Sequence, residues 1–438
     1  MSDEMNKTRR DFIKSASTTV AGAALASTMV ARSSYAASSD TIRLGMIGCG
    51  GRCTGAAAQA MNTEGPTKLV AMCDAFGDKV EASHKRLKKQ YKGKVDVPKD
   101  NMFTGFDGYK KVIDSDIDLV LIATPPHFRP MHVEYAIKQG KHVFAEKPVA
   151  VDAAGVRTML AATAEAKKKN LALAIGLQRH HEAQYKQTIQ RLQDGAIGDI
   201  NFTRAYWNGG GVWVRPRQAG QTEMEYQMRN WYYFNWLCGD HIVEQHIHNL
   251  DVINWLKGGF PVKGQGMGGR QVRTGKDHGE IYDHFAVEFT YEDGSTLLSE
   301  CRHIKGCFNS VSEHAHGSKG SANIGRATIY NTMNASKDIK WKFEGRRQGG
   351  HQQEHHDLFA EIRKGNIPNE GEYGAKSTMT SIFGRMLTYS GKEMSWDQAI
   401  NSNKSLMPEA YRWDAKPPTV PDADGNYPIP MPGKTKVI

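Results

Sequence analysis

Cysteine is scarce in this sequence, which has six cysteines in 438 residues and no CxxC pair. A CxxC pair is typical of zinc sites and redox-active dithiols, so neither class is indicated. The HExxH pattern of zinc hydrolases is also absent. A disulfide between Cys301 and Cys307 stays open, because pairing cannot be deduced from the sequence.

Apart from the N-terminal segment, the sequence has no long apolar run, so no membrane-spanning helix is expected in the rest of the chain. The net charge of +10 does not indicate a nucleic-acid partner, because the basic residues are spread along the chain. Basic residues are clustered only at 85–94 and 167–169, and such clusters are typical of the solvated faces or ends of helices. A chain of this length exceeds one ordinary core, which favours two domains.

The first 36 residues predict an export signal. Thr8 to Lys14 reads TRRDFIK, a mildly apolar segment follows, and Ser34-Tyr35-Ala36 resembles a cleavage site. Together they predict a twin-arginine signal, the twin-arginine translocation machinery as a partner, and a periplasmic or otherwise exported protein without a stable anchor after processing. A disordered tail or a membrane anchor is the alternative.

A glycine-rich turn lies between two predicted strands, Ile42–Ile47 and Lys68–Cys73. Gly48, Gly50 and Gly51 let the backbone approach a pyrophosphate, and the N-terminus of the following helix favours the anion. Asp74, about 25 residues further on, can accept from a ribose hydroxyl, which favours NAD over NADP. Cys53 takes the place of the usual third glycine, and an ordinary βαβ turn is the alternative interpretation.

Two domains follow from the remaining pattern. Alternating strands and helices up to the predicted strand 172–176 indicate an α/β Rossmann domain over residues 37–177. Residues 178–438 predict an α+β domain with a large, mostly antiparallel open sheet, which includes a hairpin turning at Asp293-Gly294. One helix is expected over Gly239–Leu256. An open sheet needs covering, so a homodimer or homotetramer is expected.

Polar residues follow two of the predicted central strands. Thr124, Pro125 and His127 come after the strand 118–123, and Glu146-Lys147-Pro148 follows the strand 142–145. In an open α/β sheet, ligands bind at the carboxyl ends of the strands. These residues are therefore candidates for the cofactor site.

The motifs IGCGG, ATPPH and AEKP, with HxxD inside a GD…H…D…W segment, resemble the Gfo/Idh/MocA oxidoreductase family. The resemblance implies a Rossmann domain, an open-sheet domain and NAD-dependent chemistry on CH–OH groups of a carbohydrate-like substrate. It also implies that Lys147 lies beside the nicotinamide and the reacting carbon. An acid, a histidine and an aspartate map onto Glu244, His248 and Asp251, with Glu244 where an aspartate is usual.

These residue types suit hydride transfer. A histidine can take the proton of a substrate hydroxyl, while a lysine stabilises the developing alkoxide or relays its proton. We therefore predict Lys147, His248 and Glu244 as catalytic residues, with Asp251 orienting the substrate. Glu244, His241 and His248 as metal ligands are the alternative, but the family needs no metal and none is predicted.

Weaker candidates complete the site. Arg52 is expected near the cofactor, and Gln178 and Arg179 near the nicotinamide and substrate, since they follow the last Rossmann strand. Trp231 belongs to an aromatic loop that could stack on sugar rings, and core packing is the alternative for that loop. The stacking candidates are Trp207, Trp213, Trp231, Tyr232 and Trp236.

An exported enzyme has no ready NAD pool, so we expect a tightly held cofactor and a redox-neutral cycle. The alternatives are an oxidation-assisted glycosidase that uses NAD, and a sugar-binding protein that keeps the fold without the chemistry.

Overall fold

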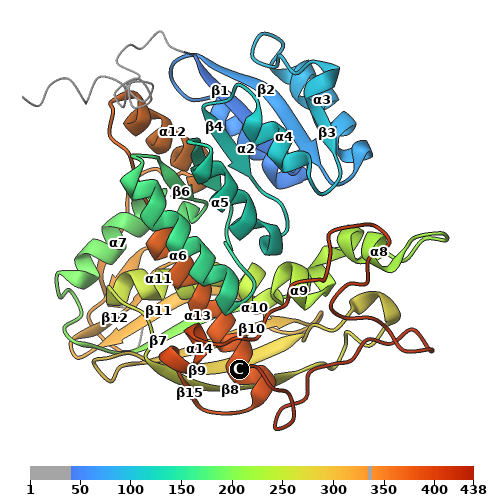
Figure 1. The fold of residues 1–438 in the computed structure, drawn as a ribbon. Helices are drawn as coiled ribbons and strands as arrows, with labels where there is room; N and C mark the ends of the chain where they lie inside the picture. Colours follow the sequence, from blue (N-terminus) through green and yellow to red (C-terminus); the bar gives the residue numbers. More distant parts are fainter. Residues whose placement is uncertain (1–40, 334–337) are drawn as a thin grey trace, which may run out of the picture.

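The computed structural model describes residues 41–333 and 338–438, in two stacked domains (Figure 1). The export signal predicted for residues 1–36 lies outside the described residues. Within the described part of the chain, no helix is both long and apolar enough to cross a membrane.

A six-stranded parallel sheet forms the N-terminal domain. Its strands are β1 (Ile42–Ile47), β2 (Thr67–Asp74), β3 (Met102–Thr104), β4 (Leu119–Ile122), β5 (His142–Ala145) and β6 (Leu173–Ile175). They lie in the order β3-β2-β1-β4-β5-β6, so the chain reverses direction across the sheet between β1 and β4. This order is that of a Rossmann domain, whose ligands bind at that switch point. The predicted fold class is confirmed for this half.

Helices cover both faces of this sheet, and the strands are apolar because they are buried on both sides. β4 reads LVLI and every residue of it is buried. The helices are α2 (Gly51–Met61), α3 (Gly77–Gln90), α4 (Gly108–Asp114), α5 (Arg129–Lys138) and α6 (Ala153–Lys168), with 3₁₀ turns η1 (Lys99–Asn101) and η2 (Pro126–Phe128).

The C-terminal domain contains a nine-stranded sheet. In spatial order its strands are β14 (Ile339–Lys342), β13 (Thr328–Tyr330), β12 (Gly320–Asn323), β11 (Ser310–Gly317), β7 (Ile200–Gly209), β10 (Thr296–His303), β9 (His284–Thr290), β8 (Lys263–Gly269) and β15 (Met394–Ser395). Only β7 and β10 pair in parallel, so the expected mostly antiparallel sheet is confirmed. The hairpin that turns at Asp293-Gly294 joins β9 to β10, as predicted.

Helices α11 and α13 pack on one face of this sheet (Figure 1). On β10, the side chains facing the helices are buried, whereas the alternating ones, such as Leu298 and Glu300, are only half-buried. The helices of this half are α7 (Ala183–Gln193), α8 (Glu223–Arg229), α9 (Asn235–Cys238), α10 (His241–Glu244), α11 (Ile247–Lys257), α12 (Gly350–Arg363), α13 (Gly371–Ser390) and α14 (Trp396–Ile400), with 3₁₀ turns η3 (Gln178–His181), η4 (Trp231–Tyr233) and η5 (Lys276–His278).

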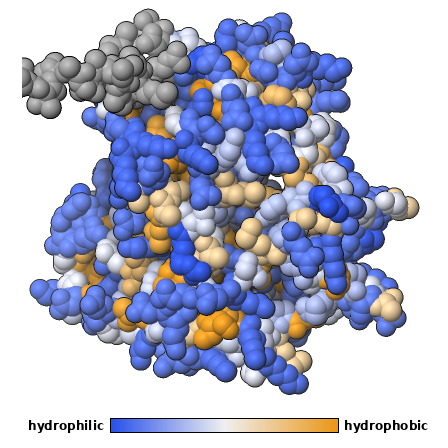
Figure 2. Space-filling model, in the orientation of Figure 1, coloured by the Kyte–Doolittle hydropathy of each residue, from blue (hydrophilic) through white to orange (hydrophobic). Residues whose placement is uncertain are grey.

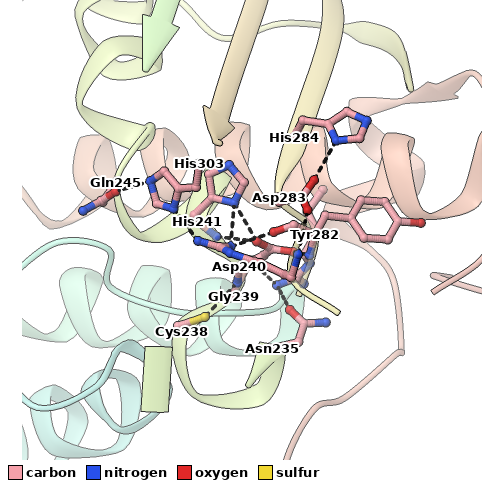
Figure 3. A network of polar contacts seen from close by, with 12 residues as sticks. Asn235, Cys238, Gly239, Asp240, His241, Gln245, Tyr282, Asp283, His284 and His303 are labelled. Atoms are coloured by element: carbon pink, nitrogen blue, oxygen red, sulfur yellow. Dashed lines mark hydrogen bonds and ion pairs between the residues drawn. The ribbon is translucent and has the colours of Figure 1, made fainter. Parts of the chain in front are cut away.

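The helix predicted over Gly239–Leu256 is wrong as a single element, because the chain forms α10 and α11 with a break at Gln245 and His246. Gly239 and Asp240 both have positive φ, 78° and 72°, so neither can belong to a right-handed helix. The unusual backbone at Asp240 is stabilised by its carboxylate, which accepts from the backbone N–H of Tyr282 at 2.8 Å (Figure 3). The same carboxylate accepts from the hydroxyl of Tyr389 at 2.6 Å.

The chain returns to the N-terminal domain after the second sheet. Helix α12 packs against α2, and Leu358, Phe359 and Ile362 join the apolar core around β1. Residues of the C-terminal half therefore form one wall of the space above the Rossmann strands.

Candidate active site

One cavity of about 860 Å³ lies between the two domains. Its size is that of a ligand pocket and its position is the switch point of the sheet. On the face shown in Figure 2, apolar residues gather at the waist between the domains, while the outer surfaces are mainly hydrophilic. The predicted residues that line the cavity are Gly48, Gly50, Gly51, Arg52, Asp74, Thr124, Pro125, Glu146, Lys147, Trp231, Glu244 and His248.

The glycine turn is shaped for a phosphate-bearing ligand. Gly48 has a φ of +91°, and a Cβ there would lie 3.0 Å from the carbonyl carbon and oxygen of Ala123. A Cβ on Gly50 or Gly51 would meet no protein atom within 4 Å, because these residues face the cavity. Helix α2 begins there without a side-chain cap or an acid in its first turn. Its free backbone N–H groups fit a pyrophosphate, so the residues present suit a dinucleotide.

Asp74 stands at the end of β2 and lines the same cavity. Its carboxylate accepts from the backbone N–H of Cys49 at 2.6 Å and of Phe76 at 3.0 Å. Burial raises the pKa of Asp74, and these two hydrogen bonds oppose that rise. Each carboxylate oxygen keeps a further lone pair, so Asp74 can still accept from a ribose hydroxyl.

Cys53, at the third glycine position, is buried in the first turn of α2. Its sulfur contacts the carbonyl oxygens of Ile47 and Leu121 at 3.6 and 3.7 Å, so it fills the space between helix and sheet. Burial raises the pKa of the thiol to about 12, which makes it unreactive. Cys301 and Cys307 are both free, so the disulfide left open by the sequence is not formed.

Arg52 joins the two halves of the chain. Its guanidinium forms ion pairs with Glu146, which follows β5, at 2.6 Å and with Glu354 of α12 at 2.9 Å. Both carboxylates are buried, and burial followed by the nearby Glu146 raises the pKa of Glu354 well above its ordinary value. Arg52 therefore lines the cavity as a bridge between domains and is not a free cation.

Lys147 and Glu244 meet across the cavity. The Lys147 ammonium donates to the backbone carbonyl oxygen of Glu244 at 2.8 Å and lies 3.8 Å from its carboxylate. Burial raises the pKa of Glu244, while the cations Lys147 and Arg129 oppose this rise. The Lys147–Pro148 peptide is cis. The end of β5 and the end of α10 thus place a cation and a carboxylate together in the cavity wall.

His248 lies in the first turn of α11 and stacks on Trp207, with ring centroids 5.9 Å apart. Its Nδ1 is buried without a hydrogen-bond partner among the described residues. Burial, and then the cations Lys147 and Arg179, lower the pKa of His248 well below its ordinary value. At neutral pH the ring is therefore uncharged and able to accept a proton.

Four predicted site residues do not line the cavity. The imidazole of His127 is buried and lies 2.8 Å from the Tyr411 hydroxyl, on the side where the C-terminal segment packs. Asp251 is bonded to His180 and Ser377, both at 2.8 Å, because the helix turns its side chain toward α13. We therefore revise the expected role of both from ligand contact to support of the cavity wall.

The other two are Gln178 and Arg179, in η3. Gln178 is buried and packs closely against the start of α12. Its backbone carbonyl lies so near Gly350 that a Cβ on Gly350 would clash with it. Arg179 pairs with buried Glu313 and donates to the backbone carbonyl of His248 at 2.9 Å. Arg179 therefore holds α11 in place and does not reach the cavity.

The aromatic loop divides into two groups. Trp207, Trp213 and Trp231 line the cavity, whereas Tyr232 and Trp236 are buried in a separate apolar cluster. Trp231 meets Trp213 edge-on, with centroids 5.7 Å apart. Stacking on a sugar ring stays a prediction for the first group, and core packing explains the second.

Arg129 and Gln245 are among the cavity residues that the sequence analysis did not predict. Arg129 donates to the backbone carbonyl of Thr124 at 2.7 Å and to that of Pro148, and so ties together the ends of β4 and β5. Gln245 lies in the break between α10 and α11. Gln245 could have been predicted as a site residue, because it lies three positions before His248. No motif near Arg129 in the sequence indicates that Arg129 belongs to the site.

The metal alternative has no support in the described part of the chain, where no group of three or more His, Cys, Asp or Glu side chains is arranged to hold an ion. His241 is fully buried and bonded to Asp240.

Comparison with known families agrees with this geometry. A model described as oxidoreductase family, NAD-binding Rossmann fold, matches residues 42–175, and the GFO/IDH/MocA C-terminal domain matches residues 185–323. The two models together cover more than half of the chain, which belongs to the GFO/IDH/MocA family. It is therefore an oxidoreductase with an NAD-binding Rossmann domain.

Two relatives show how far sequence similarity extends. Inositol 2-dehydrogenase of Rhizobium meliloti is 26% identical over 284 residues, which are 64% of this chain and 74% of that protein. Glycosyl hydrolase family 109 protein 1 of Bacteroides fragilis is 28% identical over 183 residues, and the match spans only 38% of its length.

Solved structures share the fold. The aldose-aldose oxidoreductase from Caulobacter crescentus superposes with a TM-score of 0.63 at 19% identity, covering 81% of this chain and 100% of that one. Scyllo-inositol dehydrogenase from Lactobacillus casei, solved with NAD(H) and scyllo-inositol, gives 0.60 at 19% identity, covering 82% and 100%.

Proposed function

We propose that this protein is an exported NAD-dependent oxidoreductase that acts on a sugar, a sugar derivative or a cyclitol. The observation that carries the proposal is a single cavity lined both by the dinucleotide turn and by Lys147, Glu244 and His248. The names of two relatives support a polyol substrate: inositol 2-dehydrogenase, and a dTDP-sugar 3-reductase of Actinomadura kijaniata.

The chain's own residues would manage the proton. A bound NAD would supply the acceptor for a hydride from the substrate carbon. His248, uncharged in its buried position, accepts the proton of the hydroxyl on that carbon. Lys147 stabilises the negative charge that develops on the oxygen, and Glu244 orients a neighbouring hydroxyl. Trp207 fixes the plane of the His248 ring.

Export and cofactor retention are the further parts of the proposal. Arg9 and Arg10 would direct the folded protein to the twin-arginine machinery with NAD already bound. A retained cofactor must be reoxidised in place, so the net reaction is redox-neutral. Replacing both arginines by lysine should leave the protein in the cytoplasmic fraction, and unchanged export would contradict this part.

Nucleotide content tests retention. Protein purified from its native compartment should release about one NAD(H) per chain on denaturation, and its reduced-nicotinamide absorbance should change with sugars. The Lys147→Ala/His248→Ala double variant should keep the nucleotide and lose the absorbance change. A native protein that contains no nucleotide and does not respond to sugars would contradict the proposal. A double variant with an unaltered phenotype would favour a sugar-binding protein.

An oxidation-assisted glycosidase is the second candidate, favoured by several relatives named glycosyl hydrolase family 109 proteins. In that case the sugar of a glycoside would be oxidised, would eliminate its aglycone, would add water across the resulting double bond and would then be reduced again. With aryl glycosides, release of the phenol without lasting NADH would support it, whereas a lack of release with active sugar oxidation would exclude it.

A second copy of this chain is the proposed cover for the open face of the nine-stranded sheet. Outward side chains such as Tyr206 and Leu298 are only half-buried there. The molar mass measured by light scattering should be that of a dimer or tetramer, and Leu298→Asp should shift this mass toward that of the monomer. A monomeric wild-type protein would contradict this assembly.

A further inference from the structure

A chain of polar contacts leads away from the cavity into the core. Gln245 lines the cavity, and its Oε1 lies 2.8 Å from Nε2 of His303 on β10 (Figure 3). The other ring nitrogen of His303, Nδ1, is bonded to the guanidinium of Arg273. His303 and Arg273 are about 5% and 4% exposed, so these contacts are shielded from water.

The direction of each hydrogen bond follows from chemistry. Arginine has only donors, so Nδ1 of His303 must be the acceptor. Burial, and then the charges of His241 and Arg273, lower the pKa of His303, so the ring stays neutral with its proton on Nε2. That proton is donated to Oε1 of Gln245. A flipped amide would place its N–H groups against this N–H donor, so the orientation is set.

Arg273 is itself held in position. It donates to the backbone carbonyl of Tyr282 at 2.7 Å, and its charge is opposed by the fully buried carboxylate of Asp240. Hydrogen bonds therefore run without a gap from the Tyr282 carbonyl through Arg273 and His303 to Gln245, which restrains the Gln245 amide.

The amide nitrogen of Gln245 points away from His303 (Figure 3). No acceptor among the described residues bonds to it, so two N–H donors remain at the cavity. Gln245 follows Glu244, whose carbonyl oxygen binds Lys147, and stands three residues before His248. A donor in this position suits an acceptor oxygen of a polyol.

We infer that Gln245 is a substrate-binding residue that donates to a hydroxyl oxygen of the polyol, and that His303 is a positioning residue that orients it. The inference rests on the proposed function for the class of ligand. It assigns a role to a glutamine that lies between the motif residues Glu244 and His248, and to a histidine on a strand far from them in the sequence.

The test is a double-mutant cycle on the NADH-loaded protein with myo-inositol and D-glucose as probes. Calorimetry gives the Kd of each probe, steady-state kinetics give KM and kcat, and fluorescence gives NADH affinity. Gln245→Met keeps the length of the side chain without its donors, and should weaken probe binding about 3- to 10-fold with NADH affinity unchanged. His303→Leu should do the same in the wild-type background but add nothing to Gln245→Met. His303→Gln, which keeps an N–H toward Gln245, should recover part of the affinity.

The outcomes separate this inference from the proposed function. Unchanged probe affinity in Gln245→Met overturns the inference, and an equal effect of His303→Leu in both backgrounds overturns the positioning role. If the probes bind but are not turned over, only the proposed function is overturned. The inference can still be tested, because the double-mutant cycle can be measured from the Kd values alone. A wild-type protein that binds neither probe overturns both.

Discussion

The ammonium of Lys147 lies 2.8 Å from the backbone carbonyl oxygen of Glu244, which brings the end of β5 against the end of α10. A cation from the Rossmann domain is thereby held next to the carboxylate and the histidine of the other domain. The contact also leaves the ammonium two further N–H donors, which are free to bind a substrate oxygen.

Lys147→Met should lower kcat about 10²- to 10⁴-fold and leave NADH affinity within about threefold, because the lysine stabilises charge that develops only during the reaction. Stopped-flow or steady-state kinetics and fluorescence titration measure the two quantities. Lys147→Arg is the control that keeps the charge. A loss confined to KM would contradict a role in the chemical step.

His248 should remain unprotonated in the free enzyme well below the ordinary histidine pKa of about 6.5. The pH profile of kcat/KM should therefore stay flat as the pH falls through ~6.5, with its acid limb lower. His248→Gln should lower kcat about 10²- to 10⁴-fold and lose that limb. An acid limb at ~6.5 that disappears in His248→Gln would show that burial does not set this pKa.

Asp74→Ala should weaken NADH binding about tenfold and reduce the preference over NADPH, because the variant lacks the acceptor for a ribose hydroxyl. Asp74→Asn, which keeps one oxygen, is the matched control and should lose less. Fluorescence titration with both nucleotides gives the ratio. An unchanged ratio in Asp74→Ala would show that Asp74 serves only the Cys49 and Phe76 N–H groups.

Arg52→Ala should destabilise the protein by about 2–3 kcal/mol, because buried Glu146 and Glu354 lose their shared cation. The value is below that of a fully buried pair since the Arg52 side chain is 30% exposed. Urea unfolding measures it, and the added change Glu354→Gln should recover part of the loss. Equal stability of single and double variants would contradict the bridge.

The protein should lose stability as the pH falls below ~6.5. Burial lowers the pKa of His127 to about 4, and of His132 and His246 to about 3. Between about pH 6.5 and pH 4 the unfolded chain binds more protons than the folded one, so the free energy of unfolding decreases as the pH falls. Each of these histidines contributes up to ~1.4 kcal/mol per pH unit to that decrease. His246→Gln should reduce the slope by about one proton; an unchanged slope would contradict the assignment.

Local pattern was enough for the cofactor half of the site. β1 and β5 have the predicted bounds, and Gly48, Gly50 and Asp74 line one cavity, because a strand, a glycine turn and a helix are contiguous in the chain. The family motif likewise located Lys147, Glu244 and His248. These features depend on neighbours in the sequence, so the sequence by itself determined them.

Only the tertiary structure decided what these residues meet. Arg52 pairs with Glu354, which lies 302 positions away, and His303 reaches Gln245 across 58. Helix α10 begins only after Asp240, whose buried carboxylate is satisfied by Tyr282 and Tyr389. Burial and charge pairing depend on the packing of distant segments, and spacing along the chain does not contain that information.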